Sequence, residues 1–392
     1  MSLDQQSLDK CIVQRSNMPI IVSCIDINIL ISSFISNIKD MCSWSNVCKI
    51  NYGIKYKLQF MLHSKYIKHF DRFIITQLLS SSEHSTIDIR RLKDTLEVLV
   101  CNNRLTNYTL LKLKHLKFLD LSFNTKISDD TLKKMVSLQH LNIGRNYMIS
   151  DNSIKYLVNL TYLNCGLMNI RLTDESISRL SNLLTLYSSY INISNKAFKN
   201  IPNLKQLYCE YNNRLTDEIF IYIPKLKELS VGHNRFTIKA ISNLIYLTHL
   251  TINQEMIIDN ECFNTLKNLI YLNCNYNNTI SDEALLYLPN LKYLKKCNNY
   301  FTDIGLCTLK QLIYLDCGIN VRFTDNSFCY LNKLQILLCG KNKNIKDHTV
   351  LFFPHLSYLY CEFNKNLTNN CILHSKKLIF VDIGHNTSIR TN

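Results

Sequence analysis

One spacing of leucines recurs along most of the chain and limits the folds open to it. From residue 96 onward the sequence follows Leu-x-x-Leu-x-[Cys/Leu/Ile/Val]-x-x-Asn, and successive copies are 20 to 23 residues apart. The 14 copies open at Leu96, Leu116, Leu138, Leu160, Leu183, Leu204, Leu226, Leu247, Leu269, Leu291, Leu312, Leu334, Leu356 and Leu378. A unit of this length cannot bury a core by itself, so its copies must stack on one another.

The asparagine that closes each copy completes the leucine-rich-repeat signature. It is present in ten copies, at Asn124, Asn146, Asn212, Asn234, Asn277, Asn299, Asn320, Asn342, Asn364 and Asn386. In the copy that opens at Leu269, Leu272 and Cys274 are two residues apart and share one side of a strand, whereas Tyr271 and Asn273 share the other. We expect the closing asparagine to turn inward, where its amide pairs with backbone groups of the neighbouring turns.

A second motif follows the asparagine and predicts a helix. In Ser281-Asp282-Glu283, the serine suits a helix N-cap and the acids suit the first turn. Leu285 and Leu288, three residues apart, share one helical face. The expected fold class is therefore α/β: a leucine-rich-repeat solenoid with a curved parallel β-sheet and about two turns of helix per copy on its convex side. It covers residues 96–392, with about 14 repeats of 21–23 residues.

The first 95 residues lack the repeat and divide into a tail (1–17), a motif-bearing segment (18–56) and a helical linker or N-terminal cap (57–95). Residues 18–56 contain Met18-Pro19, an apolar stretch from Leu30 to Ile35, Ile38-Lys39-Asp40-Met41 and Val47-Cys48-Lys49. This segment resembles an F-box, the small helical domain that docks on a Skp-type adapter of cullin ubiquitin ligases. The distance from Pro19 to Asp40 is longer here than in the family. A plain helical cap on the solenoid is the alternative interpretation.

The resemblance implies a function for both parts of the chain. It assigns contacts with the adapter to Pro19, Leu30, Phe34, Ile38, Met41, Trp44 and Val47. In F-box proteins with leucine-rich repeats, the box binds the ligase and the repeats hold the substrate. With this composition, the architecture is similar to that of F-box/leucine-rich-repeat proteins of large DNA viruses of protists. It implies an intracellular protein, in the cytoplasm or nucleus of a host cell.

The outward strand positions give a candidate protein-binding surface on the concave face. Aromatic residues recur there, and tyrosine is frequent in binding hot spots. Tyrosine also suits any exposed strand, and an AT-rich codon bias is a second source of it. The candidate residues are Phe118, Tyr162, Tyr187, Tyr208, Tyr271, Tyr293, Tyr314, Tyr358 and Tyr360, with Glu210, Asp316 and Glu362.

The charge pattern bears on the class of partner. The chain carries a net charge of +15, which permits nucleic-acid binding. Its lysines form no run typical of a phosphate-binding patch. The charged outward strand positions are acidic except for Lys295, which disfavours nucleic acid on the concave face and favours a basic protein segment.

The sequence offers no catalytic, metal or cofactor motif. It lacks a CxxC pair, a phosphate-binding loop, an HExxH motif and a nucleophile elbow. The 16 cysteines are better explained as reduced core residues than as a disulfide framework, and no signal peptide or membrane span is expected. We therefore expect a non-enzymatic F-box-type adapter. A repeat scaffold without a ligase link and, less favoured, a nucleic-acid binder are the alternatives.

Overall fold

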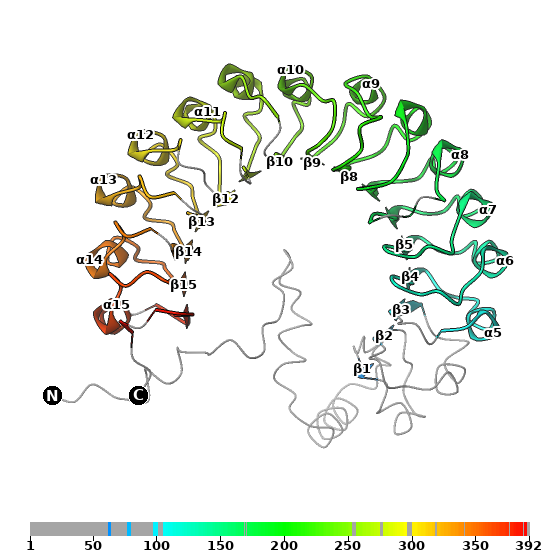
Figure 1. The fold of residues 1–392 in the computed structure, drawn as a ribbon, viewed down its shortest axis with the longest axis horizontal. Helices are drawn as coiled ribbons and strands as arrows, with labels where there is room; N and C mark the ends of the chain where they lie inside the picture. Colours follow the sequence, from blue (N-terminus) through cyan, green and yellow to red (C-terminus); the bar gives the residue numbers. More distant parts are fainter. Residues whose placement is uncertain are drawn as a thin grey trace, which may run out of the picture.

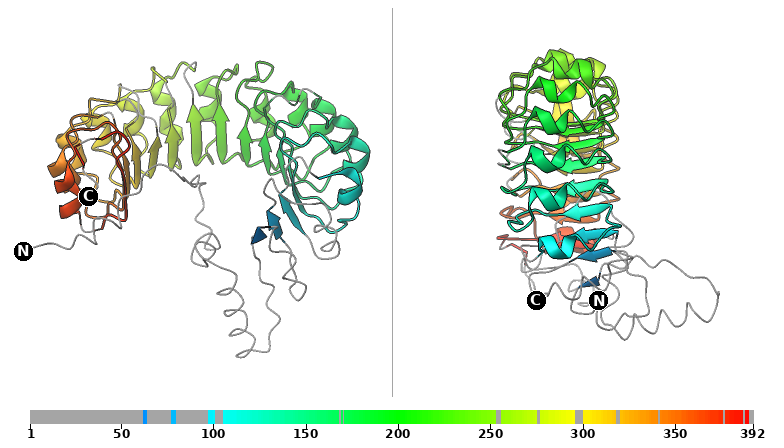
Figure 2. Two further views of the ribbon diagram at one scale, coloured as in Figure 1. Left: turned by 60° about the horizontal axis from the view of Figure 1, so that its bottom comes forward. Right: turned by 90° about the vertical axis from the view of Figure 1, so that its right-hand side faces the viewer.

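The chain from residue 97 onward winds into an open arc (Figure 1). The computed structural model describes residues 62–63, 77–79, 97–100, 105–167, 169, 171–252, 256–274, 277–295, 300–317, 320–340, 342–375, 377–386 and 388–389. Short strands line the inner, concave side of the arc and short helices line its outer, convex side, and the same two layers are visible in both turned views (Figure 2). The predicted solenoid is confirmed.

The strands form a single 16-stranded sheet in which each one pairs, in parallel, with the next along the chain. They are β1 (Leu62–His63), β2 (Gln77–Leu79), β3 (Val98–Val100), β4 (Phe118–Asp120), β5 (His140–Asn142), β6 (Tyr162–Asn164), β7 (Thr185–Tyr187), β8 (Gln206–Tyr208), β9 (Glu228–Val231), β10 (His249–Ile252), β11 (Tyr271–Asn273), β12 (Tyr293–Lys295), β13 (Tyr314–Asp316), β14 (Ile336–Leu338), β15 (Tyr358–Tyr360) and β16 (Phe380–Asp382). The register pairs equivalent residues of successive repeats, such as Leu119 with Leu141 and Leu141 with Leu163. The leucine spacing therefore predicts β3–β16 correctly.

The convex helices are shorter than the sequence suggested. They are α5 (Asn107–Leu110), α6 (Asp129–Leu132), α7 (Asp151–Ile154), α8 (Asp174–Ile177), η2 (Asn195–Phe198), α9 (Ile219–Tyr222), α10 (Ile238–Ser242), η3 (Asn260–Thr265), α11 (Asp282–Leu286), α12 (Asp303–Leu306), α13 (Asp325–Phe328), α14 (Asp347–Val350) and α15 (Asn369–His374), with η2 and η3 in the 3₁₀ form. The expectation of two helical turns is wrong because the chain tightens after the first turn. The amide of Leu288, for example, bonds to the carbonyl of Leu285, three residues back.

The core runs along the arc between the two layers. Strand residues alternate as predicted: in β4, Leu119 is fully buried between the half-buried Phe118 and Asp120. On the helix side, Leu285 and Leu288 are also fully buried. Each repeat thus supplies both walls of its own segment of core.

The closing asparagines form a ladder through this core. The side chain of Asn364 donates to the carbonyls of Asn342 (2.8 Å) and Ile345 (3.1 Å) in the preceding repeat, and it accepts the amide of Asn366 (3.1 Å). Asn277 and Asn320 likewise donate to the preceding repeat. The inward orientation predicted for the asparagine is confirmed, and it pairs backbone groups that would otherwise be buried without partners.

A second ladder joins the starts of the helices on the convex side. Asp174 of α8 accepts the backbone amide (2.6 Å) and the hydroxyl (2.5 Å) of Ser194, the N-cap of the next helix. Asp217 bonds Thr237 in the same way, at 2.8 Å in both cases. These aspartates were predicted to complement their own helix dipole, but they also join each repeat to the next one.

The sheet begins before the first recognised repeat. β1 and β2 pair in register ahead of β3, with Leu78 opposite Leu99. The prediction of a helical segment over 57–95 is therefore wrong at these five residues, because they extend the parallel sheet. The F-box-like segment 18–56 lies outside the described residues. Among the described residues, no helix is both long and apolar enough to cross a bilayer.

Candidate functional site

The predicted aromatic and acidic residues lie on the concave face. Each occupies an outward position on a strand or just after one, and each is half-buried. This group comprises Phe118, Tyr162, Tyr187, Tyr208, Tyr271, Tyr293, Tyr314, Tyr358 and Tyr360, together with Glu210, Asp316 and Glu362. The parallel register brings neighbouring side chains of this group into rows that cross the strands.

In the first part of the arc these rows are closely stacked. The ring of His140 lies between Phe118 and Tyr162, with ring centroids 3.9 and 3.6 Å apart. Tyr187 and Tyr208 stack at 3.9 Å, and Tyr162 meets Tyr187 at a tilt. We call these five residues the strand row. The sequence prediction omitted His140, although it occupies the same repeat position as Phe118 and Tyr162.

In the later part of the arc the rings are further apart. Tyr271, Tyr293 and Tyr314 succeed one another at 6.5 and 6.4 Å with tilted planes. The ammonium group of Lys295 lies 5.4 Å from the Tyr271 ring and 5.1 Å from the Tyr314 ring. Cation–π attraction thus holds a positive charge among these tyrosines.

A further row, which the sequence analysis missed, lies at the rim just beyond the strands. It comprises Phe123, Arg145, Leu167, Tyr190, Tyr211 and His233, one from each of six consecutive repeats, and we call it the rim row. All six have positive φ, from 52° to 67°. Residues with bulky side chains rarely adopt this left-handed conformation, and strained backbone of this kind concentrates at functional sites.

Side chains of the rim row contact one another across the repeats. Tyr211 stacks on Tyr190 at 4.2 Å and on His233 at 4.1 Å, while the Arg145 guanidinium lies 5.2 Å from the Phe123 ring. The sequence held a signal for this row, because most of its members directly precede the closing asparagine of their repeat. The alternation of strand residues does not reveal this row, because its members lie beyond the ends of the strands.

The acidic groups on the first part of the concave face bond mainly to neutral donors. Glu210 accepts the hydroxyl of Ser230 at 2.5 Å, and Glu228 accepts that of Tyr208 at 2.7 Å. Asp120 accepts the amide of Asn142 at 2.9 Å. No lysine or arginine within the described ranges pairs with these three carboxylates, so this surface retains negative charge.

The titratable groups of this face are poorly suited to proton transfer at neutral pH. Burial lowers the pKa of His140 to about 4, against a small opposing effect of Asp120, so the imidazole is neutral at pH 7. Burial also raises the pKa of the Tyr162 and Tyr208 hydroxyls. In the core, burial raises the pKa of the Cys165 thiol to about 12. These groups are suited to packing and hydrogen bonding.

Cysteine and metal chemistry is likewise not supported by the described part of the chain. Its ten cysteines are all free, and seven of them are buried. No group of three or more His, Cys, Asp or Glu side chains in those ranges could hold a metal ion.

Comparison with known proteins supports the fold. The solved structure of Rad7 in the yeast Rad7–Elc1 complex aligns with a TM-score of 0.51 and 16% identity, covering 91% of this chain and 98% of that one. A leucine-rich-repeat protein of Leptospira interrogans (TM-score 0.49, 21% identity, 79% of this chain and 90% of that one) and an internalin of Listeria monocytogenes (0.47, 23%, 79% and 85%) are also similar. No protein-family model and no curated protein matches the sequence. The chain has a leucine-rich-repeat fold.

The adapter-binding residues predicted from the F-box resemblance are not placed by these findings. Pro19, Leu30, Phe34, Ile38, Met41, Trp44 and Val47 all lie outside the described residues. Their contact with an adapter remains a prediction from the sequence.

Proposed function

We propose that this protein is a non-enzymatic, F-box-type substrate-recognition adapter of a cullin ubiquitin ligase, whose concave face holds a protein substrate. Residues 18–56 would dock on a Skp-type adapter, and the solenoid would bring its substrate close to the ligase. Catalysis would then belong to the partner subunits, and this chain would act by raising the effective concentration of the substrate.

The observation that carries the binding role is the continuous concave sheet with its aromatic and acidic outward residues. Sixteen strands at ~4.8 Å spacing give a surface on the order of 70 Å along the arc, which suits a protein partner. Tyrosine and histidine rings present rigid, amphipathic area at a small loss of conformational entropy. A solenoid keeps such a surface in place because every repeat is fixed by both neighbours.

Two weaker observations support the link to a ligase. The F-box-like segment 18–56 lies on the N-terminal side of the repeats, as in the F-box family with leucine-rich repeats. In addition, the yeast neighbour Rad7 was solved in complex with another protein, Elc1. A repeat scaffold without a ligase link is the second candidate, and it rests on the same concave face.

Co-purification of the full chain with a Skp-type adapter and a cullin tests the proposal. We expect the intact chain to capture both, and the double variant Ile38→Asp, Val47→Asp to lose capture because charges replace two apolar contacts. Tyr293→Ala serves as the matched control, since it alters the concave face and should leave capture unchanged. Circular dichroism of each variant establishes that the solenoid is folded.

Failure of the intact, folded chain to capture the adapter would contradict the ligase link and leave the scaffold function. Equal capture by the double variant would show that residues 18–56 do not dock in the way the F-box resemblance implies.

A further inference from the structure

The strand row and the rim row enclose a strip of small and polar residues. Between them lie the outward residues Asp120, Asn142 and Asn164. Each repeat adds one more outward residue, two positions further along the chain. These further residues are Ser122, Gly144, Gly166 and Ser189, and then Glu210 and Gly232. At ~3.3 Å per strand residue, the two rows are roughly 15 Å apart over β4–β6. A strip of this width, bounded by the rings of the strand row on one side and by Phe123, Arg145 and Leu167 on the other, has room for one extended chain.

The strip narrows along the arc. In the repeats of β4, β5 and β6 the strand row occupies the first residue of the strand, at Phe118, His140 and Tyr162. In β7 and β8 it occupies the last residue, at Tyr187 and Tyr208. There, only two residues per repeat separate the two rows, and one of them, Ser189 or Glu210, faces outward. We call the whole strip the trough.

The fold does not require glycine at position 166 in the trough floor. Gly166 is not among the residues with positive φ, so its backbone suits any side chain. A Cβ built at Gly166 would approach no other heavy atom more closely than 3.4 Å, which is an ordinary contact. A residue that is small without a local need keeps the floor low between the two rows.

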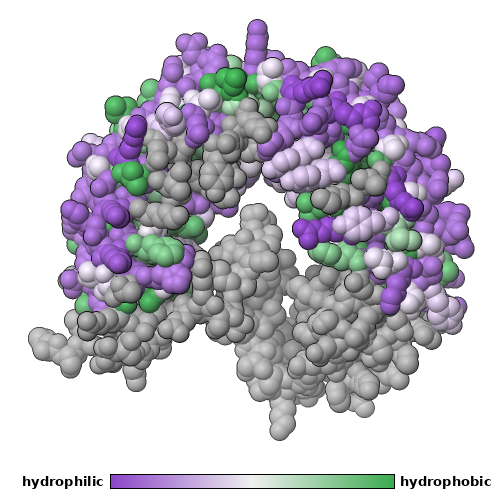
Figure 3. Space-filling view, viewed as in Figure 1, coloured by the Kyte–Doolittle hydropathy of each residue, from purple (hydrophilic) through white to green (hydrophobic). Residues whose placement is uncertain are grey.

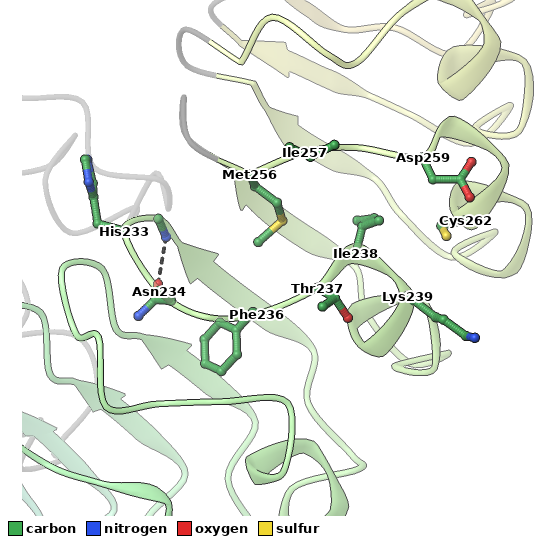
Figure 4. A pocket seen from close by; sticks show the side chains of 11 residues that line it. His233, Asn234, Phe236, Thr237, Ile238, Lys239, Met256, Ile257, Asp259 and Cys262 are labelled. Carbon is green, nitrogen blue, oxygen red and sulfur yellow. Dashed lines mark hydrogen bonds between the residues drawn. The ribbon is translucent and has the colours of Figure 1, made fainter.

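A cavity lies at the narrow end of the trough. It has a volume of about 360 Å³ and includes His233, the last member of the rim row, in its wall. Met256 and Ile257 lie on one side of it, across from Phe236 and Ile238 (Figure 4). Ile257 is 82% exposed, so its side chain is accessible to a partner at this cavity.

The cavity coincides with a break in the asparagine ladder. The repeat that opens at Leu247 has Glu255 where its neighbours have the closing asparagine. In the repeat before it, the side-chain oxygen Oδ1 of Asn234 accepts the backbone amide of Gly232 at 2.8 Å (Figure 4). The equivalent Asn364 accepts instead from the amide two residues ahead. The two loops that line the cavity thus depart from the regular repeat.

The charge of the trough indicates the chemistry of its occupant. Asp120 and Glu210 lie in its floor and Glu228 lies beside its narrow end, whereas Arg145 is the only arginine of the rim row. In a chain with a net charge of +15, this is a local excess of negative charge. Complementary potential favours a positively charged partner and sets its orientation.

We propose that the trough binds an extended, basic segment of a partner protein, and that an apolar side chain of this segment enters the cavity beside His233. The inference rests on the proposed protein-binding function of the concave face and specifies it. Aromatic walls would pack against the segment, the carboxylates would face its lysine or arginine side chains, and the cavity would anchor one end. Such anchoring by one buried apolar side chain is common at interfaces.

Selection of peptides on the full chain tests this proposal. A phage-displayed library of random dodecapeptides is selected on the immobilised protein, and enriched sequences are synthesised and measured by fluorescence anisotropy. We expect enriched peptides to combine lysine or arginine with one large apolar residue. Ser189→Trp, which fills the narrow part of the trough, should weaken their binding by roughly tenfold or more. The matched Ser189→Ala variant should bind within about twofold of the wild type.

Two further variants separate the trough from the rest of the molecule. Ile257→Asp, at an exposed position, should weaken peptides that carry the apolar anchor by roughly tenfold. Tyr330→Ala, at an exposed position just after the convex helix α13, should leave all of them unchanged. Because Ile257→Asp and Ser189→Trp alter different repeats, misfolding of either one still leaves the other as a test.

Three outcomes would overturn the inference. They are enrichment of acidic peptides, peptide binding that Ser189→Trp leaves unchanged, and single-stranded RNA binding that competes with the peptides and is lost in Ser189→Trp. Failure of the ligase proposal is distinguishable, since adapter capture depends on residues 18–56. A chain that captures the adapter but enriches no basic peptide contradicts the trough alone.

Discussion

The first part of the arc, β4–β9, and the later part, β11–β16, share the same pattern of buried residues. They differ in the residues that face outward on the concave side and at the rim. In the first part, rings stack at 3.6 to 4.2 Å and a strained rim row runs beside them. In the later part, the tyrosines of β11–β13 are 6.4 to 6.5 Å apart and Lys295 lies among them. The rim position there is strained at Phe363, which has a φ of 66° and stacks on His385 at 4.9 Å. The space-filling view shows strongly hydrophilic residues over much of the outer flank in both parts (Figure 3).

The cores differ less than the surfaces. The third inward position of the strand segment holds Leu121, Ile143, Cys165 and Cys209 in the first part and Cys274, Cys317, Cys339 and Cys361 in the later part, and all of these side chains are fully buried. The asparagine ladder is regular at Asn342, Asn364 and Asn386. Earlier, Ile191 takes the place of one asparagine. The later part is thus the more regular scaffold, and the first part carries the more specialised surface.

The largest expected effect is the difference in alkylation rate between an exposed cysteine and the buried cysteines of the core. Burial raises the pKa of Cys339 well above its usual value and that of Cys361 to about 12, whereas Cys329 is exposed. With iodoacetamide at pH 8, we expect Cys329 to be alkylated at least ~100-fold faster than Cys339 or Cys361, because the thiolate is the reactive form. Peptide mass spectrometry over time measures this ratio. Similar rates at all three sites would mean that the later core opens easily.

Two asparagines test the ladder directly. Asn364 makes three hydrogen bonds, whereas the side chain of Asn169 is buried without a hydrogen-bond partner among the described residues. We expect Asn364→Leu to lower the free energy of unfolding by roughly 3 kcal/mol, since it strands buried backbone groups, and Asn169→Leu to change it by less than about 1 kcal/mol. Urea unfolding followed by circular dichroism measures both. Equal losses would show that the hydrogen bonds of Asn364 do not account for its contribution.

Acid should weaken the first part of the arc through His140. Its folded pKa of about 4 lies below the unfolded value of 6.5, so between these values the unfolded state binds more protons. The free energy of unfolding should therefore be highest above pH 6.5 and fall as the pH drops toward 4, by less than about 3 kcal/mol. Urea unfolding at pH 7.5 and pH 5 tests this. His140→Phe should remove this share of the pH dependence, and an unchanged dependence in that variant would rule out His140 as its source.

The smallest expected effect concerns strain in the rim row. Leu167 has a φ of 67° and is 41% exposed. Asparagine tolerates the left-handed conformation better than leucine, so Leu167→Asn should raise the free energy of unfolding by roughly 0.5 kcal/mol. Thr161→Asn, at a position outside the rim row, is the control and should give no gain. A loss of stability in Leu167→Asn would argue that packing by the leucine outweighs the strain.

The inward residues could be predicted from the sequence because each is fixed by one repeated physical requirement. A leucine on the buried side of a strand and an asparagine that pairs the turn backbone leave a strict spacing, as at Leu272 and Asn277. β2 was missed because its copy of the repeat keeps only the first two apolar positions, Ile75 and Leu78, and has Glu83 in place of the closing asparagine. The rim row and the helix length depend on backbone dihedral angles, which the spacing of apolar residues does not encode.

The candidate site was predicted in outline and missed in detail. The alternation of strand residues placed Tyr162, Tyr208 and Glu210 on the concave face. It did not distinguish stacked from separated rings, because that depends on side-chain rotamers and on the step from the first to the last strand residue at Tyr187. His140 was overlooked because its neutral, stacked state follows from burial between two rings and not from its chemistry in solution.

The aspartate ladder on the convex side has a consequence for how such a chain can change in length. Most junctions use the same pair of groups, a carboxylate at the start of one helix and a hydroxyl residue at the start of the next, as in Asp174–Ser194 and Asp217–Thr237. At Asn107, Asn195 and Asn260 a side-chain amide oxygen takes the place of the carboxylate. Duplicating or deleting one whole unit therefore leaves most new junctions with matching partners. Loss or gain of part of a unit would not, so variation in length among relatives should occur in steps of whole repeats.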